Sequence, residues 1–210
     1  MGDYYETEEV TGYWNARHLT WDQEMSPEAR ASLFTYKKNW FNERFEHILP
    51  LTQFPEGKVL DYGCGCGMYS VPLRQRFEKY YGVDTSAAAL GIALRHFGLD
   101  SQNSFRLLPR QGAALPFPNG FFDCVVSITV LQHLPVDVRI ATIQEIKRVL
   151  KPNGGYLGLE MIGDTAAFDM PAMSEEEWHS AWSPLKLVFD IPPKHPEWAA
   201  DNVWYSEGAR

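Results

Sequence analysis

The sequence contains few cysteines, and their arrangement excludes a disulfide framework. Cys64, Cys66 and Cys124 are odd in number, and the first two are separated by one residue in a glycine-rich stretch. A Cys-x-Cys pair suggests a metal site, but zinc ligands are usually spaced by two or more residues and need further Cys or His partners. We therefore interpret Cys64 and Cys66 as small side chains tolerated in a tight turn, and we expect no metal.

Long apolar runs and an excess of basic residues are also lacking. No stretch approaches the roughly 20 apolar residues of a membrane-spanning helix. Residues 1–9 are acidic where a secretory signal would be basic and then apolar, so we expect a cytoplasmic protein. The 19 Lys and Arg against 27 Asp and Glu give a net charge of -8. This charge opposes a nucleic-acid partner and favours a small-molecule substrate, and no membrane association is expected.

The chain does have length and a regular alternation of strands and helices. Its 210 residues allow one domain with a full core. We expect residues 1–54 to form an aromatic lid or helical extension, and residues 55–210 to form the main domain. The pattern predicts an α/β fold with a doubly wound, Rossmann-like sheet of about seven strands, mostly parallel with an antiparallel edge strand and helices on both faces. The predicted strands are 58–62, 80–84, 104–108, 121–129, 156–161, 185–191 and 202–206.

The stretch 59–70 organises the rest of the chain. It predicts a short buried strand, a turn with glycine at 63, 65 and 67, and the start of a helix, which together can receive a nucleotide-like ligand. A dinucleotide-binding turn requires Gly-x-Gly-x-x-Gly, but Met68 breaks that spacing, and the acidic Asp61 stands before the first glycine. The turn therefore differs from a pyrophosphate-binding loop.

The run from Asp61 to Gly67 resembles motif I of the class I S-adenosylmethionine-dependent methyltransferases of the small-molecule type. The resemblance covers about residues 59–161 and implies S-adenosyl-L-methionine as the cofactor, with the glycine turn under its methionine moiety. The contacts implied for this turn are made by Asp61, Gly63, Cys64, Gly65 and Gly67.

Asp84 ends the second predicted strand, far enough downstream to close one β-α-β unit. A carboxylate at that place can accept hydrogen bonds from both ribose hydroxyls, and Thr85 beside it is predicted to contact the cofactor too. The alternative is that Asp84 caps the next helix, a role that Ser86 could equally fill.

The resemblance also implies an adenine contact after the third strand. Counting back from Leu115-Pro116-Phe117 puts Gln111 in the place of the Asp that holds the adenine amino group in the family. The carbonyl oxygen of Gln111 could accept the same hydrogen bond, and Gly112 and Ala113 could bring backbone groups instead. Ile128, at the end of the fourth strand, is predicted to lie at the same edge.

Four further residues are candidates for the acceptor side of the site. His133 follows the fourth strand and is a candidate general base, because imidazole transfers protons near neutral pH; the alternative is that it only shapes the loop. Tyr13, Trp14 and His18 belong to an aromatic stretch before motif I, predicted as an arm or short helix, and resemble the lid of small-molecule methyltransferases. These three residues and His133 are the predicted substrate contacts.

The resemblance implies an in-line transfer of a methyl group to a small-molecule O, N or C acceptor, for which the protein chiefly aligns the reactants and excludes water. A base is needed only if the acceptor is a hydroxyl or a protonated amine. The alternatives are a methyltransferase-like cofactor-binding subunit without turnover, and a transferase that moves an aminopropyl group. A nicotinamide dehydrogenase would share the fold, but Met68 and Tyr69 break its glycine spacing.

Overall fold

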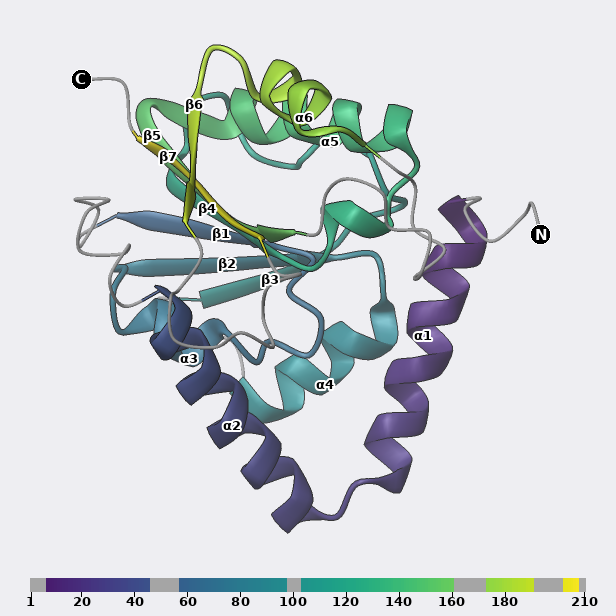
Figure 1. Ribbon diagram of the computed structural model, residues 1–210. Coiled ribbons are helices and arrows are strands. Elements are labelled where there is room, and N and C mark those ends of the chain that lie inside the picture. Colours follow the sequence, from purple (N-terminus) through teal and green to yellow (C-terminus); the bar gives the residue numbers. More distant parts are fainter. Residues whose placement is uncertain (1–6, 46–56, 98–102, 161–172, 191–201, 208–210) are drawn as a thin grey trace.

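A seven-stranded β-sheet forms the centre of the computed structural model (Figure 1). The structure describes residues 7–45, 57–97, 103–160, 173–190 and 202–207. In chain order, the strands are β1 Lys58–Tyr62, β2 Lys79–Asp84, β3 Asn103–Leu107, β4 Phe122–Ile128, β5 Leu150–Glu160, β6 Lys186–Asp190 and β7 Asn202–Glu207. Across the sheet they lie in the order β3-β2-β1-β4-β5-β7-β6.

Strands β1 to β5 pair in parallel, and β7 pairs antiparallel with both β5 and β6. From β1, successive strands are added on one side up to β3, and β4 and β5 are added on the other side. This reversal of strand order between β1 and β4 is typical of a doubly wound sheet. The predicted α/β, Rossmann-like class is confirmed. All residues of β4 are buried except Asp123, as expected for a central strand covered on both faces.

Helices cover both faces of the sheet, and one helix stands at its end. Figure 1 shows α5 and α6 on one face, α2, α3 and α4 toward the other, and α1 along the side of the molecule. No helix among the described residues is long and apolar enough to cross a membrane. The helices are α1 Thr7–Glu24, α2 Pro27–Phe45, α3 Ser70–Arg74, α4 Ala87–Phe97, the 3-10 helix η1 Leu131–His133, α5 Val136–Val149 and α6 Glu175–Trp182.

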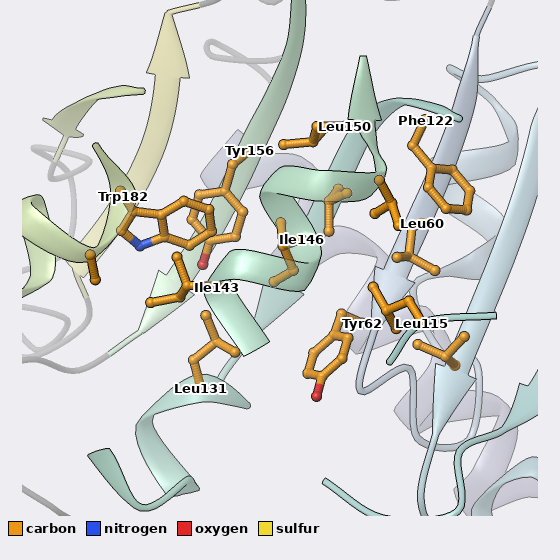
Figure 2. Close-up of a cluster of buried hydrophobic side chains, with 14 of the residues drawn as sticks. Leu60, Tyr62, Leu115, Phe122, Leu131, Ile143, Ile146, Leu150, Tyr156 and Trp182 are labelled. Atoms are coloured by element: carbon orange, nitrogen blue, oxygen red, sulfur yellow. The ribbon is translucent and has the colours of Figure 1, made fainter. Parts of the chain in front are cut away.

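Alternate residues of β1 enter two separate cores. Leu60 and Tyr62 belong to the larger core, whereas Val59 belongs to the core that contains Phe41 of α2 and Leu73 of α3. Figure 2 shows the larger core, where α5 packs on the sheet and α6 packs beside it. Its labelled residues are Leu60, Tyr62, Leu115, Phe122, Leu131, Ile143, Ile146, Leu150, Tyr156 and Trp182.

The N-terminal segment is more helical than its sequence predicts. The prediction of an arm or short helix is wrong in length, because α1 is an 18-residue helix. Its sequence carries no apolar stripe, so helical periodicity gives no signal. The run Ser26-Pro27-Glu28 predicts the start of a second helix, and α2 is observed there. Ser26 Oγ accepts from the backbone N of Ala29 at 3.2 Å, and Phe41 is fully buried. Residues 46–56, which hold the predicted boundary between extension and main domain, lie outside the described residues.

Two local predictions differ from the structure. The spacing of apolar residues in α4 predicts that Leu94 lies on its buried face, but Leu94 is 40% exposed, whereas Ala89 and Ile92 are buried. The run Pro152–Gly155 predicts a turn, but it lies within β5, where the pairing register with β4 shifts after Phe122. The turn-forming residues lie at this irregularity in the pairing, so β5 continues through them.

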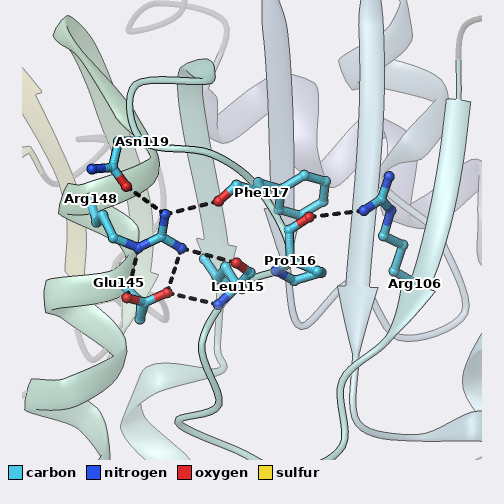
Figure 3. Close-up of polar contacts among 7 residues, drawn as sticks. All are labelled: Arg106, Leu115, Pro116, Phe117, Asn119, Glu145 and Arg148. Atoms are coloured by element: carbon cyan, nitrogen blue, oxygen red, sulfur yellow. Dashed lines mark hydrogen bonds and ion pairs between the residues drawn. The ribbon is translucent and has the colours of Figure 1, made fainter.

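Arg148 of α5 ties down the loop between β3 and β4 (Figure 3). Its guanidinium donates to the carbonyl oxygens of Leu115 and Phe117 at 3.0 and 2.9 Å. It also forms an ion pair of 2.7 Å with Glu145, whose carboxylate accepts from the backbone N of Leu115 at 2.7 Å. The planar donor set of arginine suits several acceptors at once, so the loop is held by one side chain.

We expect Arg148→Met to lower the free energy of unfolding by about 1 kcal/mol, because the methionine keeps the apolar stem but leaves the loop carbonyls without these donors. The arginine side chain is 29% exposed, so water replaces part of the loss. Urea unfolding measures the difference. Gln144→Met, at an exposed position one turn earlier on α5, is the matched control, and an equal effect in both variants would contradict the prediction.

Candidate functional site

A cavity opens at the carboxyl ends of β1, β2 and β4, at the point where the strand order of the sheet reverses. Doubly wound sheets bind ligands at this point. The cavity is lined by residues of α1, the strand ends and η1. These residues are Trp14, His18, Tyr62, Gly63, Gly65, Val83, Asp84, Thr85, Leu108, Gln111, Ile128, Thr129, Val130, His133 and Leu134.

The glycine turn forms one wall of this cavity, and its glycines are required for different reasons. Gly63, Gly65 and Gly67 all have positive φ angles, of 72°, 52° and 74°. A Cβ at Gly63 would come within 2.5 Å of the side chain of Val130, whereas one at Gly65 would meet nothing closer than 3.7 Å. Gly63 and Gly65 line the cavity, but Gly67 packs toward Ala93 of α4.

Asp84 presents a carboxylate to the cavity and is fixed by backbone amides. Its two oxygens accept from the backbone N of Gly65 at 2.8 Å and of Ser86 at 2.7 Å. Burial raises the pKa of Asp84 above its usual range, and these amide hydrogen bonds oppose the shift. The helix cap is supplied by Ser86, whose Oγ accepts from the backbone N of Ala89 at 3.1 Å. Capping of α4 is thus carried by Ser86, and Asp84 is placed beside the turn.

Five predicted cofactor contacts do not line the cavity: Asp61, Cys64, Gly67, Gly112 and Ala113. Asp61 is 1% exposed, and its carboxylate accepts from the Tyr80 hydroxyl at 2.8 Å. Burial raises the pKa of Asp61 to about 7. Cys64 is a buried free thiol whose pKa burial raises. The alternation along β1 turns Asp61 away from the face to which Tyr62 belongs, and Tyr62 lines the cavity.

Gln111 does line the cavity, and its carbonyl oxygen is an unused acceptor. The side chain is 7% exposed, and Oε1 has no hydrogen-bond partner among the described residues. A buried polar atom without a partner is costly, so such atoms in native proteins usually bond to water or to a ligand. The position therefore fits a donor group of a bound molecule.

His133 faces the cavity from η1, and its surroundings keep the imidazole neutral. Burial first, and the nearby Arg139 guanidinium second, lower the pKa of His133 to about 4. The Trp14 ring meets it edge to face, with 5.5 Å between the ring centroids. At neutral pH the imidazole can accept a hydrogen bond, but its low pKa makes it a weak base.

The helix α1 closes the cavity with Trp14 and His18, whose rings stack at a centroid distance of 5.8 Å. Burial lowers the pKa of His18, and the Asp84 carboxylate opposes this shift. Tyr13, the third aromatic residue predicted to contact substrate, does not line the cavity and is 39% exposed. The structure thus brings two of the three predicted lid residues to the site.

Sequence reasoning missed Asn15, which joins α1 to the start of α4. Its Oδ1 accepts from Ser86 Oγ at 2.8 Å and from the backbone N of Ala88 at 3.2 Å. The first amides of a helix lack partners within it, so a side chain from another helix can satisfy one. Because Trp14 and His18 lie on the same helix, this contact also fixes them over the cavity.

We expect Asn15→Ala to speed hydrogen exchange of the α1 amides by about fivefold, the equivalent of about 1 kcal/mol for a lost capping contact. Exchange mass spectrometry of peptides from α1 and from the start of α4 measures this. Gln23→Ala changes an exposed residue of the same helix and serves as the control. Unchanged exchange in Asn15→Ala would show that other contacts hold α1.

Among the other lining residues that the sequence did not reveal, Thr129 is unusual. It has a positive φ of 54°, a conformation that β-branched residues rarely adopt, and the sequence carries no signal of it. The remaining ones, Tyr62, Val83, Leu108, Val130 and Leu134, are aromatic or aliphatic and resemble core residues in sequence.

Comparisons with known proteins agree with this geometry. A family model described as "Methyltransferase domain" matches residues 59–154. The ubiquinone biosynthesis O-methyltransferase of Pseudomonas aeruginosa is 29% identical over 148 residues, which are 70% of this chain and 59% of that protein. The chain thus spans about three fifths of the length of this curated relative.

Solved structures of low sequence identity share the fold. The DhpI-SAH complex superposes with a TM-score of 0.67 and 19% identity over 97% of both chains. Geranyl diphosphate methyltransferase in complex with GPP and sinefungin has a TM-score of 0.62 and 20% identity over 77% of this chain and 76% of the other.

Proposed function

Because residues 59–154 form a methyltransferase domain of the class I S-adenosylmethionine-dependent family, we propose that this chain transfers a methyl group to a hydroxyl oxygen of a small molecule. The observation that carries the proposal is the meeting of Gly63, Asp84 and Gln111 in one cavity. The choice of oxygen is supported by the O-methyltransferase relatives, whereas the acceptor of those longer proteins is not carried over.

The residues of the cavity fit S-adenosylmethionine. Both oxygens of Asp84 accept from backbone amides, and because a carboxylate has about four acceptor positions, Asp84 can still accept from the ribose. Gln111 Oε1 is a buried acceptor that suits the adenine amino group. The glycine turn leaves space beside Gly65 for close approach of the methionine moiety. These roles are our assignments and follow from donor and acceptor chemistry.

The cofactor supplies an electrophilic methyl group on a sulfonium, so the protein need not generate a strong electrophile. Trp14 and His18 cover the cavity and exclude water. His133 can accept a hydrogen bond from the acceptor hydroxyl and so orient its oxygen. Because the pKa of His133 is low, the imidazole does not deprotonate the acceptor hydroxyl before the reaction. It takes the hydroxyl proton as the oxygen bonds to the methyl group and the proton becomes more acidic.

Two measurements test the proposal. Calorimetry with S-adenosylhomocysteine and with NAD compares the two ligand classes, and we expect binding of the first only. Incubation of the protein and labelled S-adenosylmethionine with a metabolite extract then detects transfer to a small molecule. Tight NAD binding without S-adenosylhomocysteine binding would overturn the assignment, and cofactor binding without label transfer would favour a subunit without turnover.

A further inference from the structure

Glu160, at the end of β5, is a buried carboxylate surrounded by donors. It is 0% exposed, and its Oε2 accepts from the backbone N of Val130 at 3.0 Å and of Gln132 at 3.1 Å. Its Oε1 accepts from the hydroxyl of Ser127 on β4. A carboxylate is costly to bury, and these donors offset part of that cost.

The segment held by Glu160 connects β4 to η1 and begins with a strained residue. Thr129 is the only residue other than glycine with a positive φ among the described residues. Its backbone N donates to the carbonyl oxygen of Leu159, at 2.7 Å, one residue before Glu160. Such conformations cost free energy and persist only where the surroundings over-determine them.

This strained segment supplies much of the cavity wall. Within a few residues of the Glu160 contacts it contributes Ile128, Thr129, Val130, His133 and Leu134. On the other side of η1, the buried Arg139 donates to the carbonyl oxygens of Gln132 and Leu134, both at 3.0 Å. The carboxyl group of Glu160 therefore holds the backbone amides of this segment, and the guanidinium of Arg139 holds its carbonyl oxygens.

We propose that Glu160 is a positioning residue for methyl transfer: it holds the turn from β4 to η1 so that Thr129 and His133 face the acceptor. The assignment of a role in transfer rests on the proposed function, whereas the hold on the turn rests on the hydrogen bonds alone. Glu160 lies outside the cavity lining and acts through the segment that it fixes.

Three variants separate this role from a general contribution to folding. Glu160→Ala removes the oxygen that accepts from the backbone amides of Val130 and Gln132. Glu160→Gln keeps an acceptor for both amides and places its NH2 toward Ser127, so it should rescue the position. Ser127→Ala removes one donor to the same carboxylate and leaves the turn amides untouched, and it is the matched control.

The main readout is the titration of the His133 imidazole, followed by NMR in histidine-labelled protein and assigned with His133→Gln. Burial is the chief cause of its low pKa, so a loosened and hydrated turn should raise it toward the ordinary value of about 6.5. We expect a rise of at least 1 pH unit in Glu160→Ala, and little change in Glu160→Gln and Ser127→Ala. If Glu160→Ala does not fold, a raised pKa in Glu160→Gln contradicts the proposal, and an unchanged one supports it.

With the acceptor found in the transfer assay, Glu160→Ala should lower kcat by more than tenfold while the Kd of S-adenosylhomocysteine changes less than threefold. An unchanged His133 pKa and kcat in a folded Glu160→Ala, or equal losses in Ser127→Ala, would overturn the proposal. Absence of transfer by the wild-type protein would count against the proposed function only, because the NMR titration reports the hold on the turn by itself.

Discussion

Replacing Asp84 with alanine is expected to weaken binding of S-adenosylhomocysteine by on the order of 1–3 kcal/mol, measured by calorimetry. Two causes act in the same direction. The carboxylate is the charged acceptor placed for the ribose hydroxyls, and it also accepts from the backbone N of Gly65, so its removal loosens the glycine turn. An affinity within twofold of wild type would show that Asp84 serves only the backbone around it.

Asp84→Asn and Asp123→Ala complete the comparison. Asparagine keeps one carbonyl acceptor, so Asp84→Asn should lose less affinity for S-adenosylhomocysteine than Asp84→Ala. Asp123 is also held by a backbone amide, that of Lys58 at 2.8 Å, and it pairs with Lys151, but it lies outside the cavity. Asp123→Ala should therefore lower stability and leave the affinity unchanged.

Local sequence signals predict the elements whose packing follows their own pattern. The apolar run of β4 was found because both faces of that strand are buried. The acidic residues that begin at Glu175 predict a short helix that ends at Trp182, and α6 has these bounds, with a capping box formed by Ser174 and Glu177. Helix α1 was not foreseen as a long helix, because polar contacts such as those of Asn15 dock it instead of an apolar stripe.

The residues of the candidate site also fall into those that local sequence signals locate and those that they do not. Gly63, Gly65, Asp84, Gln111 and His133 lie at the cavity, because each occupies a strand end or turn that the motif spacing locates. Asp61 does not line it, because side-chain direction alternates along a strand and a motif does not encode that direction. The strain at Thr129 and the buried acceptors of Glu160 arise from tertiary contacts alone.

Asp61→Asn is expected to stabilise the protein increasingly as the pH rises from about 5 to about 7, by about 1.4 kcal/mol per pH unit and on the order of 3 kcal/mol in total. Burial raises the pKa of Asp61 to about 7 from a value of 3.8 for the free group. Between these values the folded protein keeps the proton that the unfolded chain has lost. Wild-type stability therefore falls across this window, and the neutral asparagine removes the fall.

Urea unfolding of wild type and Asp61→Asn at several pH values measures the difference in their free energies of unfolding. The contributions of titratable groups that both proteins share cancel in this difference. Glu160→Gln should behave alike, since burial raises the pKa of Glu160 to about 7. His133→Gln should show the opposite trend, because the pKa of His133 is lowered to about 4. A difference independent of pH in Asp61→Asn would mean that Asp61 is ionised in the folded protein. A protonated Asp61 that accepts from the Tyr80 hydroxyl stabilises the contact between β1 and β2.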